Sequence, residues 1–339
     1  MCETELMKTV AFGSTGMRVS ALGFGTMSFG GDADEATSAA LYARVRDAGI
    51  NFFDCADVYA KGRSEEILGR LMAGHRDEIV LTSKAYFPTG PLPNQRGSSR
   101  YHLERAVEAS LRRFGTDHID VYYLHRFDDR TPLEETLRGV ERLVTAGKII
   151  YPAVSNFSAW QTSKALGVQA RHGWAPMVAT QPMYNLVKRT AEIEILPMAA
   201  AEGIAVTPYS PLGGGVLSGA YGRERRPASG RIVDNPMYTT RYGAAWVHEV
   251  AERFTALAAT HDVHPVTLAI AWVARHPAVT CPLIGARSLA QLAPALLAPA
   301  FEMSDALYAE IASLSPAPPP ATDRNEEGSG DDYAKVLAR

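Results

Sequence analysis

Residues 52–59 read FFDCADVY, an apolar run that passes directly into polar side chains. Phe52 and Phe53 are typical of a buried β-strand, and Asp54 and Tyr59 follow within one short turn. In a parallel α/β barrel, side chains at the carboxyl ends of the strands form the active site. The stretch therefore predicts a strand that delivers two proton-active groups to a functional site.

The composition is that of an ordinary globular protein. Of the 339 residues, 46% are hydrophobic and 21% are charged. The 34 lysines and arginines against 37 aspartates and glutamates give a net charge of −3, which argues against a nucleic-acid partner. Residues 1–10 lack an apolar signal core and no apolar run could span a bilayer, so we expect a cytoplasmic protein with no membrane partner. No disulfide or metal spacing links the three cysteines, and we expect reduced thiols and no metal: Cys2, Cys55 and Cys281.

Strand-like and helical segments alternate along most of the chain. Residues 9–12 and 17–22 flank a glycine-containing turn and predict a β-hairpin. Further strands are expected at residues 22–24, 52–53, 78–82, 119–124, 149–154, 178–180, 204–207 and 279–284. Helices are expected at residues 34–48, from 64, at 101–114, 133–145, from 158, and at 191–201, 246–261 and 266–275. Roughly eight strand-to-helix units predict an α/β fold, a (β/α)8 TIM barrel with an N-terminal β-hairpin.

The other parallel architecture, a doubly wound open sheet, requires a glycine fingerprint in its first strand-to-helix turn. Here Gly23 and Gly25 are followed by Thr26 and Met27 without a third glycine at the required place, so the barrel is favoured. The composition changes after residue 314 to SPAPPP and then to an acidic stretch. We expect residues 1–314 to form one barrel domain and residues 315–339 to form a flexible tail.

Helix boundaries are marked by capping residues. Ser98 or Ser99 is expected to cap the helix at residues 101–114, which Gly115 ends. Pro132 is expected at the first position of the next helix, and Ser288 is expected to cap the last barrel helix. The Gly-, Pro- and Arg-rich residues 213–236 are expected to form a loop. Five histidines without ligand spacing are expected on the surface or at helix ends: His75, His102, His248, His261 and His264.

Polar side chains follow most of the predicted strands: Asp54 and Tyr59, Lys84, His125, Asn156, Gln181, Tyr209 with Ser210, and residues 285–288. Each one alone has a structural explanation, such as a turn cap, a core tyrosine or a solvated lysine. Because the carboxyl ends of parallel strands meet at one rim, we expect these side chains to converge.

Four of these groups predict a proton-delivery site. A free tyrosine has a pKa of about 10, which makes it a poor acid near neutrality. We expect the Lys84 ammonium to lower the pKa of Tyr59, and Asp54 to orient the lysine. His125 is expected to hydrogen-bond the same substrate oxygen. The predicted chemistry is protonation of a developing alkoxide.

At these residues the chain resembles the aldo-keto reductases. The matching stretches follow the family's order from about residue 10 to residue 296. They are LGFGTMSFGG (22–31), FFDCADVY (52–59), LTSK (81–84), DVYYLHRFD (120–128), GKIIYPAVSNF (147–157), QPMYN (181–185), TPYSPLGGGVLSG (207–219) and PLIGARSLAQL (282–292). The resemblance implies a (β/α)8 barrel with a catalytic tetrad of Asp54, Tyr59, Lys84 and His125, in which Tyr59 is the general acid.

The resemblance also implies NADPH, bound without a Rossmann module. The implied cofactor contacts are Thr26, Met27, Asp54, Ser155, Asn156, Gln181, Tyr209, Ser210, Leu212, Gly214, Arg231, Gly285, Arg287, Ser288 and Gln291. Arg287 suits a phosphate because its planar fork can bind two oxygens at once, which favours NADPH over NADH. The expected activity is reduction of an aldehyde or ketone to the alcohol.

Some positions depart from the family's pattern. Pro294 and Ala295 replace a Glu-Asn pair near the adenine, and Ala220 replaces a lysine near the pyrophosphate. Two interpretations stay open: weaker cofactor binding, or compensation by Arg223, Arg225 or Arg226. Cys55 stands where Thr or Ser is frequent, and we expect a packing role for it rather than redox sensing.

Aromatic residues are expected to line an apolar mouth for a small carbonyl compound: Phe29, Tyr86, Phe87 and Phe127, together with Met27. An NADP(H)-binding sensory or accessory subunit with little turnover stays open, as in the channel-associated β subunits that resemble this family. A metal-dependent hydrolase using Asp54 and His125 is disfavoured because the sequence offers no convincing ligand cluster. A homo-oligomer also stays open.

Overall fold

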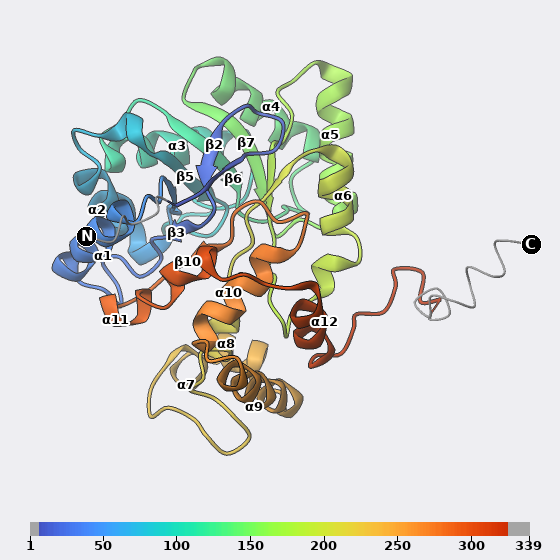
Figure 1. The fold of residues 1–339 in the computed structure, drawn as a ribbon. Coiled ribbons are helices and arrows are strands. Elements are labelled where there is room, and N and C mark those ends of the chain that lie inside the picture. The colour runs from blue at the N-terminus through green and yellow to red at the C-terminus, as the bar shows by residue number, and fades with distance from the viewer. Residues whose placement is uncertain (1–6, 325–339) are drawn as a thin grey trace, which may run out of the picture.

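The computed structural model describes residues 7–324, which build a barrel of parallel strands surrounded by helices (Figure 1). The eight-stranded sheet has the order β10-β3-β4-β5-β6-β7-β8-β9. Its strands are β3 (Gly23–Gly25), β4 (Phe52–Asp54), β5 (Val80–Ala85), β6 (Ile119–Leu124), β7 (Ile149–Ser155), β8 (Ala179–Gln181), β9 (Ala205–Val206) and β10 (Leu283–Ile284). All neighbouring pairs run parallel, so their carboxyl ends share one rim.

The barrel closes between β9 and β10. The amide of Thr280 donates to the carbonyl of Val206 at 2.9 Å, and the amide of Leu283 donates to the carbonyl of Pro208 at 2.9 Å. The expected strand at residues 279–284 is shorter than predicted. The Thr280 hydroxyl accepts the Val206 amide at 3.0 Å, and Pro282 has no amide hydrogen to donate, so the ladder becomes regular only at Leu283. The (β/α)8 prediction is confirmed.

The predicted N-terminal hairpin is present as β1 (Thr9–Ala11) and β2 (Arg18–Ser20), which pair antiparallel. Phe12 follows β1, is fully buried and packs its ring 5.6 Å from that of Phe52. In the turn, a Cβ on Gly13 would lie 2.9 Å from the backbone of Ala205. The hairpin therefore presses closely against the floor of the barrel.

The helices are α1 (Glu35–Asp47), α2 (Arg63–Leu71), α3 (Arg100–Phe114), α4 (Leu133–Thr145), α5 (Ala159–His172), α6 (Ile195–Glu202), α7 (Arg231–Asp234), α8 (Pro236–Tyr242), α9 (Ala245–Thr260), α10 (Pro265–Arg275), α11 (Leu289–Leu292) and α12 (Asp305–Ser313). Short 3-10 turns are η1 (Tyr59–Gly62), η2 (Arg76–Glu78), η3 (Thr190–Glu192), η4 (Gly213–Gly215) and η5 (Ala295–Ala300).

Local capping explains most helix starts. Ser99, not Ser98, caps α3 by accepting the amide of His102 at 3.3 Å, and Gly115 ends that helix in the left-handed conformation. Ser288 caps α11 as expected. The placement of Pro132 at the first helical position is wrong by one residue. Its ψ of 129° is extended, so Pro132 is the N-cap and α4 starts at Leu133.

Three further expectations are corrected. Residues 213–236 are not simply a loop, because η4 and α7 lie within them and α8 follows directly; Figure 1 shows α7, α8 and α9 grouped beside the barrel. The helix expected at residues 191–201 begins only at Ile195, after η3. His102 and His248 are buried inside helices, at 3% and 1% exposure.

The end of α12 at Ser313 coincides with the domain boundary predicted at residue 314, and the one-domain division stays a prediction. Cys2 and residues 325–339 of the predicted tail lie outside the described residues. Every helix within residues 7–324 is too short or too polar to cross a membrane.

Candidate active site

The centre of the rim is an ion pair between two buried residues. Lys84 on β5 is fully buried, and its ammonium lies 2.6 Å from Oδ2 of Asp54 at the end of β4. The same ammonium donates to the carbonyl of Cys55 at 2.7 Å and lies 3.5 Å from the Tyr59 hydroxyl. The structure therefore brings together three of the four residues predicted to be catalytic.

The other carboxylate oxygen of Asp54 is also fully used. Its Oδ1 accepts hydrogen bonds of 2.9 Å from the Thr82 hydroxyl and 2.9 Å from the Gln181 side-chain amide. Gln181 comes from β8, on another part of the barrel wall. Side chains from two other strands, β5 and β8, thus hold this one carboxylate, which makes the position of Lys84 well defined.

The expected lowering of the Tyr59 pKa by Lys84 is wrong for this arrangement. Burial raises the pKa of the Tyr59 hydroxyl well above its usual value, and the Asp54 carboxylate adds to this effect. The Lys84 ammonium is shared with Asp54 at a shorter distance than that to Tyr59, and its stabilisation of the phenolate does not outweigh burial. Tyr59 is therefore a firmly protonated phenol.

His125 follows β6 and is 8% exposed. Burial holds its pKa well below the usual range for histidine, with a further contribution from the positive charge of Lys84, so the imidazole is neutral. Its ring centroid lies 6.2 Å from that of Tyr59 in an edge-on arrangement. Within the described range, Nδ1 of His125 is buried without a hydrogen-bond partner.

Two predicted cofactor contacts have unusual backbone conformations. Asn156 has φ of 56° and Ser210 has φ of 58°, a region that few residues other than glycine adopt. The side-chain amide of Asn156 donates to the carbonyl of His125 at 3.0 Å, and its Oδ1 accepts the Tyr209 hydroxyl at 2.7 Å. Backbone strain of this kind is concentrated at binding sites, which makes both positions functional candidates.

The segment after β9 folds back over this rim. A Cβ on Gly214, whose φ is 67°, would lie 2.8 Å from the ring of Tyr238 on α8. The guanidinium groups of Arg231 and Arg241 lie 5.8 and 5.3 Å from the same ring. Arg231 also affects the pKa of Tyr59, so α7 places a positive charge near the tetrad. Leu212 and Ser210 lie in the turn that starts this segment.

The segment after β10 carries another predicted group of contacts. Gly285 is exposed, and the backbone amide of Arg287 donates to the side chain of Gln291 at 3.1 Å. Burial and Asp234 raise the pKa of Tyr221, and Arg287 and Arg226 both act against this rise, so the two guanidinium groups face a common region. By contrast, Ala295 is buried, and the Pro294 carbonyl accepts the Thr267 hydroxyl at 2.6 Å.

Aromatic rings extend outward from His125. Phe87 lies 4.9 Å from His125 and 5.3 Å from Tyr86, both edge-on. Phe127 packs 5.2 Å from Phe157 and 5.8 Å from Trp160. Trp160, which is 59% exposed, is a candidate that the sequence reasoning missed. The feature of the sequence that could have identified Trp160 is an aromatic residue in the first turn of the helix that follows Asn156.

Two other predicted residues lie deeper than expected. Phe29 is fully buried and packs 5.8 Å from Phe24, so it supports the wall of the site rather than offering surface to a ligand. Thr26 is also fully buried, and its hydroxyl donates to the carbonyl of Asp54 at 3.1 Å. Met27, between them, is 39% exposed.

Comparison with known proteins gives the family. The model of the Aldo/keto reductase family matches residues 21–316, which include every residue of the tetrad. The chain belongs to the aldo-keto reductase family. This aldo-keto reductase is 34% identical over 327 residues to the uncharacterized oxidoreductase YrpG of Bacillus subtilis, covering 92% of this chain and 97% of that protein.

Two relatives of this aldo-keto reductase have names of different kinds, one a channel subunit and one a reductase. It is 37% identical over 289 residues to a probable voltage-gated potassium channel subunit beta of Arabidopsis thaliana, covering 83% of this chain and 87% of that protein. It is 34% identical over 316 residues to the norsolorinic acid reductase stcV of Emericella nidulans, covering 89% of this chain and 79% of that protein. The family and its oxidoreductase members support redox chemistry on a carbonyl.

The residues of this aldo-keto reductase fit a nicotinamide dinucleotide. The site offers amide and hydroxyl groups on Asn156 and Ser155, an aromatic face on Tyr209, and guanidinium groups on Arg231 and Arg287. This mixture of amide-binding, stacking and anion-binding groups matches the parts of such a cofactor. Among the residues that the structure describes, no group of three or more His, Cys, Asp or Glu is placed to hold a metal.

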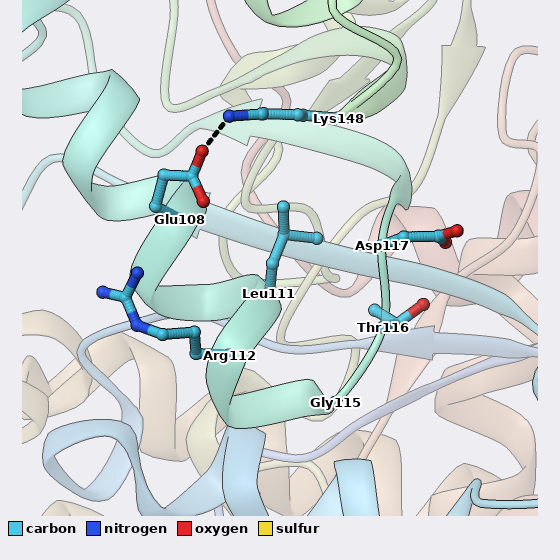
Figure 2. A pocket seen from close by; sticks show the side chains of 7 residues that line it. All are labelled: Glu108, Leu111, Arg112, Gly115, Thr116, Asp117 and Lys148. Atoms are coloured by element: carbon cyan, nitrogen blue, oxygen red, sulfur yellow. Dashed lines mark hydrogen bonds and ion pairs between the residues drawn. The ribbon is translucent and has the colours of Figure 1, made fainter.

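A broad hollow of about 730 Å³ in the aldo-keto reductase lies away from this chemistry. Figure 2 shows the side chains that line it. It is lined by the end of α3, the turn before β6, and Lys148 just before β7. These elements lie at the amino ends of the strands, opposite the rim that carries Asp54. Lys148 in this hollow is paired with Glu108, so it is not a free cation.

Proposed function

We propose that this aldo-keto reductase reduces an aldehyde or ketone to the alcohol with NADPH, and that Tyr59 is the general acid. The observation that carries the proposal is the Tyr59 hydroxyl 3.5 Å from the Lys84 ammonium, which Asp54 holds at 2.6 Å. A phenol beside a fixed cation is suited to release a proton when charge develops on a nearby oxygen.

Each residue of the tetrad has a distinct task. The neutral His125 hydrogen-bonds the carbonyl oxygen of the substrate and orients it toward Tyr59. When bound, the reduced nicotinamide supplies the hydride that the carbonyl carbon accepts. Tyr59 gives its hydroxyl proton to the carbonyl oxygen, and Lys84 stabilises the phenolate that remains. Asp54 keeps the lysine in place, because it is held in turn by Thr82 and Gln181.

Three groups of residues are proposed to hold the cofactor. Ser155, Asn156 and Gln181 would bind the carboxamide, with Tyr209 stacked on the ring and with Thr26, Met27 and Asp54 nearby. The Gln181 amide already donates to Asp54, so its carbonyl oxygen is the group left to accept. Ser210, Leu212, Gly214 and Arg231 would hold the pyrophosphate, and Gly285, Arg287, Ser288 and Gln291 the 2′-phosphate. Arg226 supports the interpretation that nearby arginines compensate for Ala220.

The substrate is proposed to be a small carbonyl compound with an apolar or aromatic body. Its reacting oxygen would lie between Tyr59 and His125, and its body against Phe87, Tyr86 and Phe127. Aromatic walls with few polar groups favour such a ligand.

The test is NADPH oxidation with a panel of aldehydes and ketones, combined with NADPH titration by fluorescence. Tyr59→Phe should abolish turnover and leave NADPH binding nearly unchanged, because only the transferable proton is removed. Tyr101→Phe, an exposed position on α3, is the matched control and should keep full activity. Unchanged turnover in Tyr59→Phe would remove Tyr59 from the mechanism.

The channel-subunit relatives favour one second candidate, an NADP(H)-binding accessory subunit with little turnover. The same experiment separates the two. Tight NADPH binding with negligible turnover across the panel, together with stable copurification with a membrane partner, would support the subunit.

A further inference from the structure

Asp57 is a second acid in the FFDCADVY stretch, and its environment differs from that of Asp54. Its side chain is 2% exposed. Neither of its carboxyl oxygens has a hydrogen-bond partner among residues 7–324, whereas both oxygens of Asp54 are fully paired. A buried carboxylate without donors costs several kcal/mol, and the usual response of such a group is to take up a proton.

The groups around Asp57 supply no spare positive charge. Glu65 on α2 is fully buried and uses one oxygen for Ser83, at 2.5 Å, and the other for Arg113 on α3, at 2.6 Å. Lys84 is committed to Asp54. The Tyr122 hydroxyl, from β6, faces the same cluster and is itself buried with no hydrogen-bond partner in the described range.

The charges in this cluster balance only when Asp57 is neutral. Asp54 and Glu65 are two carboxylates, and Lys84 and Arg113 are the two cations that pair with them. An ionised Asp57 would add a third negative charge to a site from which water is largely excluded. It could gain a cation only by drawing Arg113 from Glu65 or Lys84 from Asp54.

Asp57 also begins the turn that carries Tyr59. Its amide donates to the carbonyl of Lys84 at 3.1 Å, and the amide of Tyr59 donates to the carbonyl of Ala56 at 3.1 Å. At the other end of the turn, a Cβ on Gly62 would lie 2.9 Å from the Arg113 side chain. Asp57 and Arg113 thus lie against opposite ends of the turn.

We propose that Asp57 is a positioning residue for Tyr59, uncharged in the working enzyme, and that its ionisation displaces the Tyr59 turn and lowers turnover. This inference rests on the proposed carbonyl reductase activity. It assigns the alkaline loss of activity to a carboxyl group outside the tetrad.

The physical origin of the titration is consistent with the geometry. Burial raises the pKa of Asp57 to about 8, and the neighbouring Glu65 carboxylate adds to the rise. Arg113 and Lys84 act in the opposite direction without cancelling it, and so does the Val58 backbone amide, which does not form a well-aligned hydrogen bond with the carboxyl.

The first test is the pH profile of kcat for NADPH-dependent reduction. The kcat of the wild type should decrease as the pH rises through about 8, the value at which Asp57 ionises. This decrease is the alkaline limb of the profile. Asp57→Asn keeps the shape of the neutral acid and cannot ionise, so its rate at pH 7 should stay within about threefold of wild type. Its alkaline limb near pH 8 should be absent. Asp117→Asn, at an exposed position, is the matched control and should keep the wild-type limb.

Two outcomes of the kinetic test overturn the proposal. One is an unchanged alkaline limb in Asp57→Asn, which would assign the limb to another group. The other is a folded Asp57→Asn protein that is inactive at every pH, because a neutral side chain would then not be sufficient for positioning.

A second measurement does not depend on catalysis. The pKa of Asp57 is about 8 in the folded protein and about 3.9 in an unfolded chain. Between these two pH values the folded state therefore binds one proton that the unfolded state has released. The stability contributed by that proton is lost as the pH rises from about 4 to about 8. The melting temperature of Asp57→Asn should therefore rise relative to wild type over that window and then level off.

If the melting temperatures of wild type and Asp57→Asn change with pH in parallel across that window, the inference that Asp57 is neutral is overturned. If no carbonyl is reduced at any pH, the proposed function fails, and the melting comparison alone then decides the charge on Asp57. The two failures are therefore distinguishable.

Discussion

The hydroxyl of Tyr209 donates a 2.7 Å hydrogen bond to Oδ1 of Asn156. The bond joins the segment after β9 to the end of β7, and Asn156 in turn holds the carbonyl of His125 after β6. Two of the residues proposed to contact the nicotinamide therefore fix each other and one member of the tetrad.

Tyr209→Phe removes this hydrogen bond and keeps the ring. One such bond contributes about 0.5–1.5 kcal/mol, so the Kd for NADPH should rise by roughly 2- to 13-fold. Fluorescence titration measures the change. Tyr151→Phe is the control, because that hydroxyl bonds to Thr15 of the hairpin and lies away from the rim. Equal affinity in Tyr209→Phe and wild type would argue against a preorganising role.

Arg287→Ala tests the preference for NADPH over NADH. A hydrogen bond to a charged phosphate contributes about 1.5–3 kcal/mol, so NADPH binding should weaken roughly 10- to 150-fold. NADH has no 2′-phosphate, and its affinity should change little. Arg253→Ala, at an exposed position on α9, should affect neither cofactor. A similar loss for both cofactors would place Arg287 elsewhere than at the 2′-phosphate.

The buried pair of Lys84 and Asp54 predicts non-additive effects on stability. Lys84→Met leaves Asp54 without its cation and should lower the free energy of unfolding by about 3–5 kcal/mol. The double variant Asp54→Asn with Lys84→Met removes both charges and should recover part of that loss. Urea denaturation measures both. Additive losses would mean that the two charges do not interact as the 2.6 Å distance implies.

The turn after Tyr59 contains two successive residues with positive φ, Ala60 at 47° and Lys61 at 57°. Glycine adopts this conformation without the steric cost that alanine incurs, so Ala60→Gly should raise the free energy of unfolding by about 0.5–1 kcal/mol. Ala40→Gly, at an exposed position within α1, should instead lower it by about 1 kcal/mol. Thermal denaturation distinguishes the opposite signs.

Local patterns predicted the elements with strong boundaries. β6 at residues 119–124 and α4 at residues 133–145 match at both ends, because the apolar run lies between His118 and His125 and the amphipathic period lies between Pro132 and Gly147. The convergence of Asp54, Tyr59, Lys84 and His125 followed from their positions after strands, since parallel strands end at one rim.

Features set by distant partners were not predictable in the same way. β10 is short because Thr280 bonds through its side chain to Val206, a contact 74 residues away in sequence. The pKa of Tyr59 is raised by burial of the hydroxyl and by the Asp54 carboxylate, and no sequence spacing reveals that degree of burial. The sequence likewise gives no sign that the Asp57 carboxyl lacks hydrogen-bond partners within the described structure.

The closure of the barrel through the two residues of β10 has a consequence for biosynthesis. Until Leu283 and Ile284 have left the ribosome, β3 and β9 remain open edges that can pair with other chains. β3 pairs with β10 across more than 250 residues of sequence, so the ring can form only after most of the polypeptide exists. A nascent chain that stalls before this point should be a substrate for chaperones and prone to aggregate.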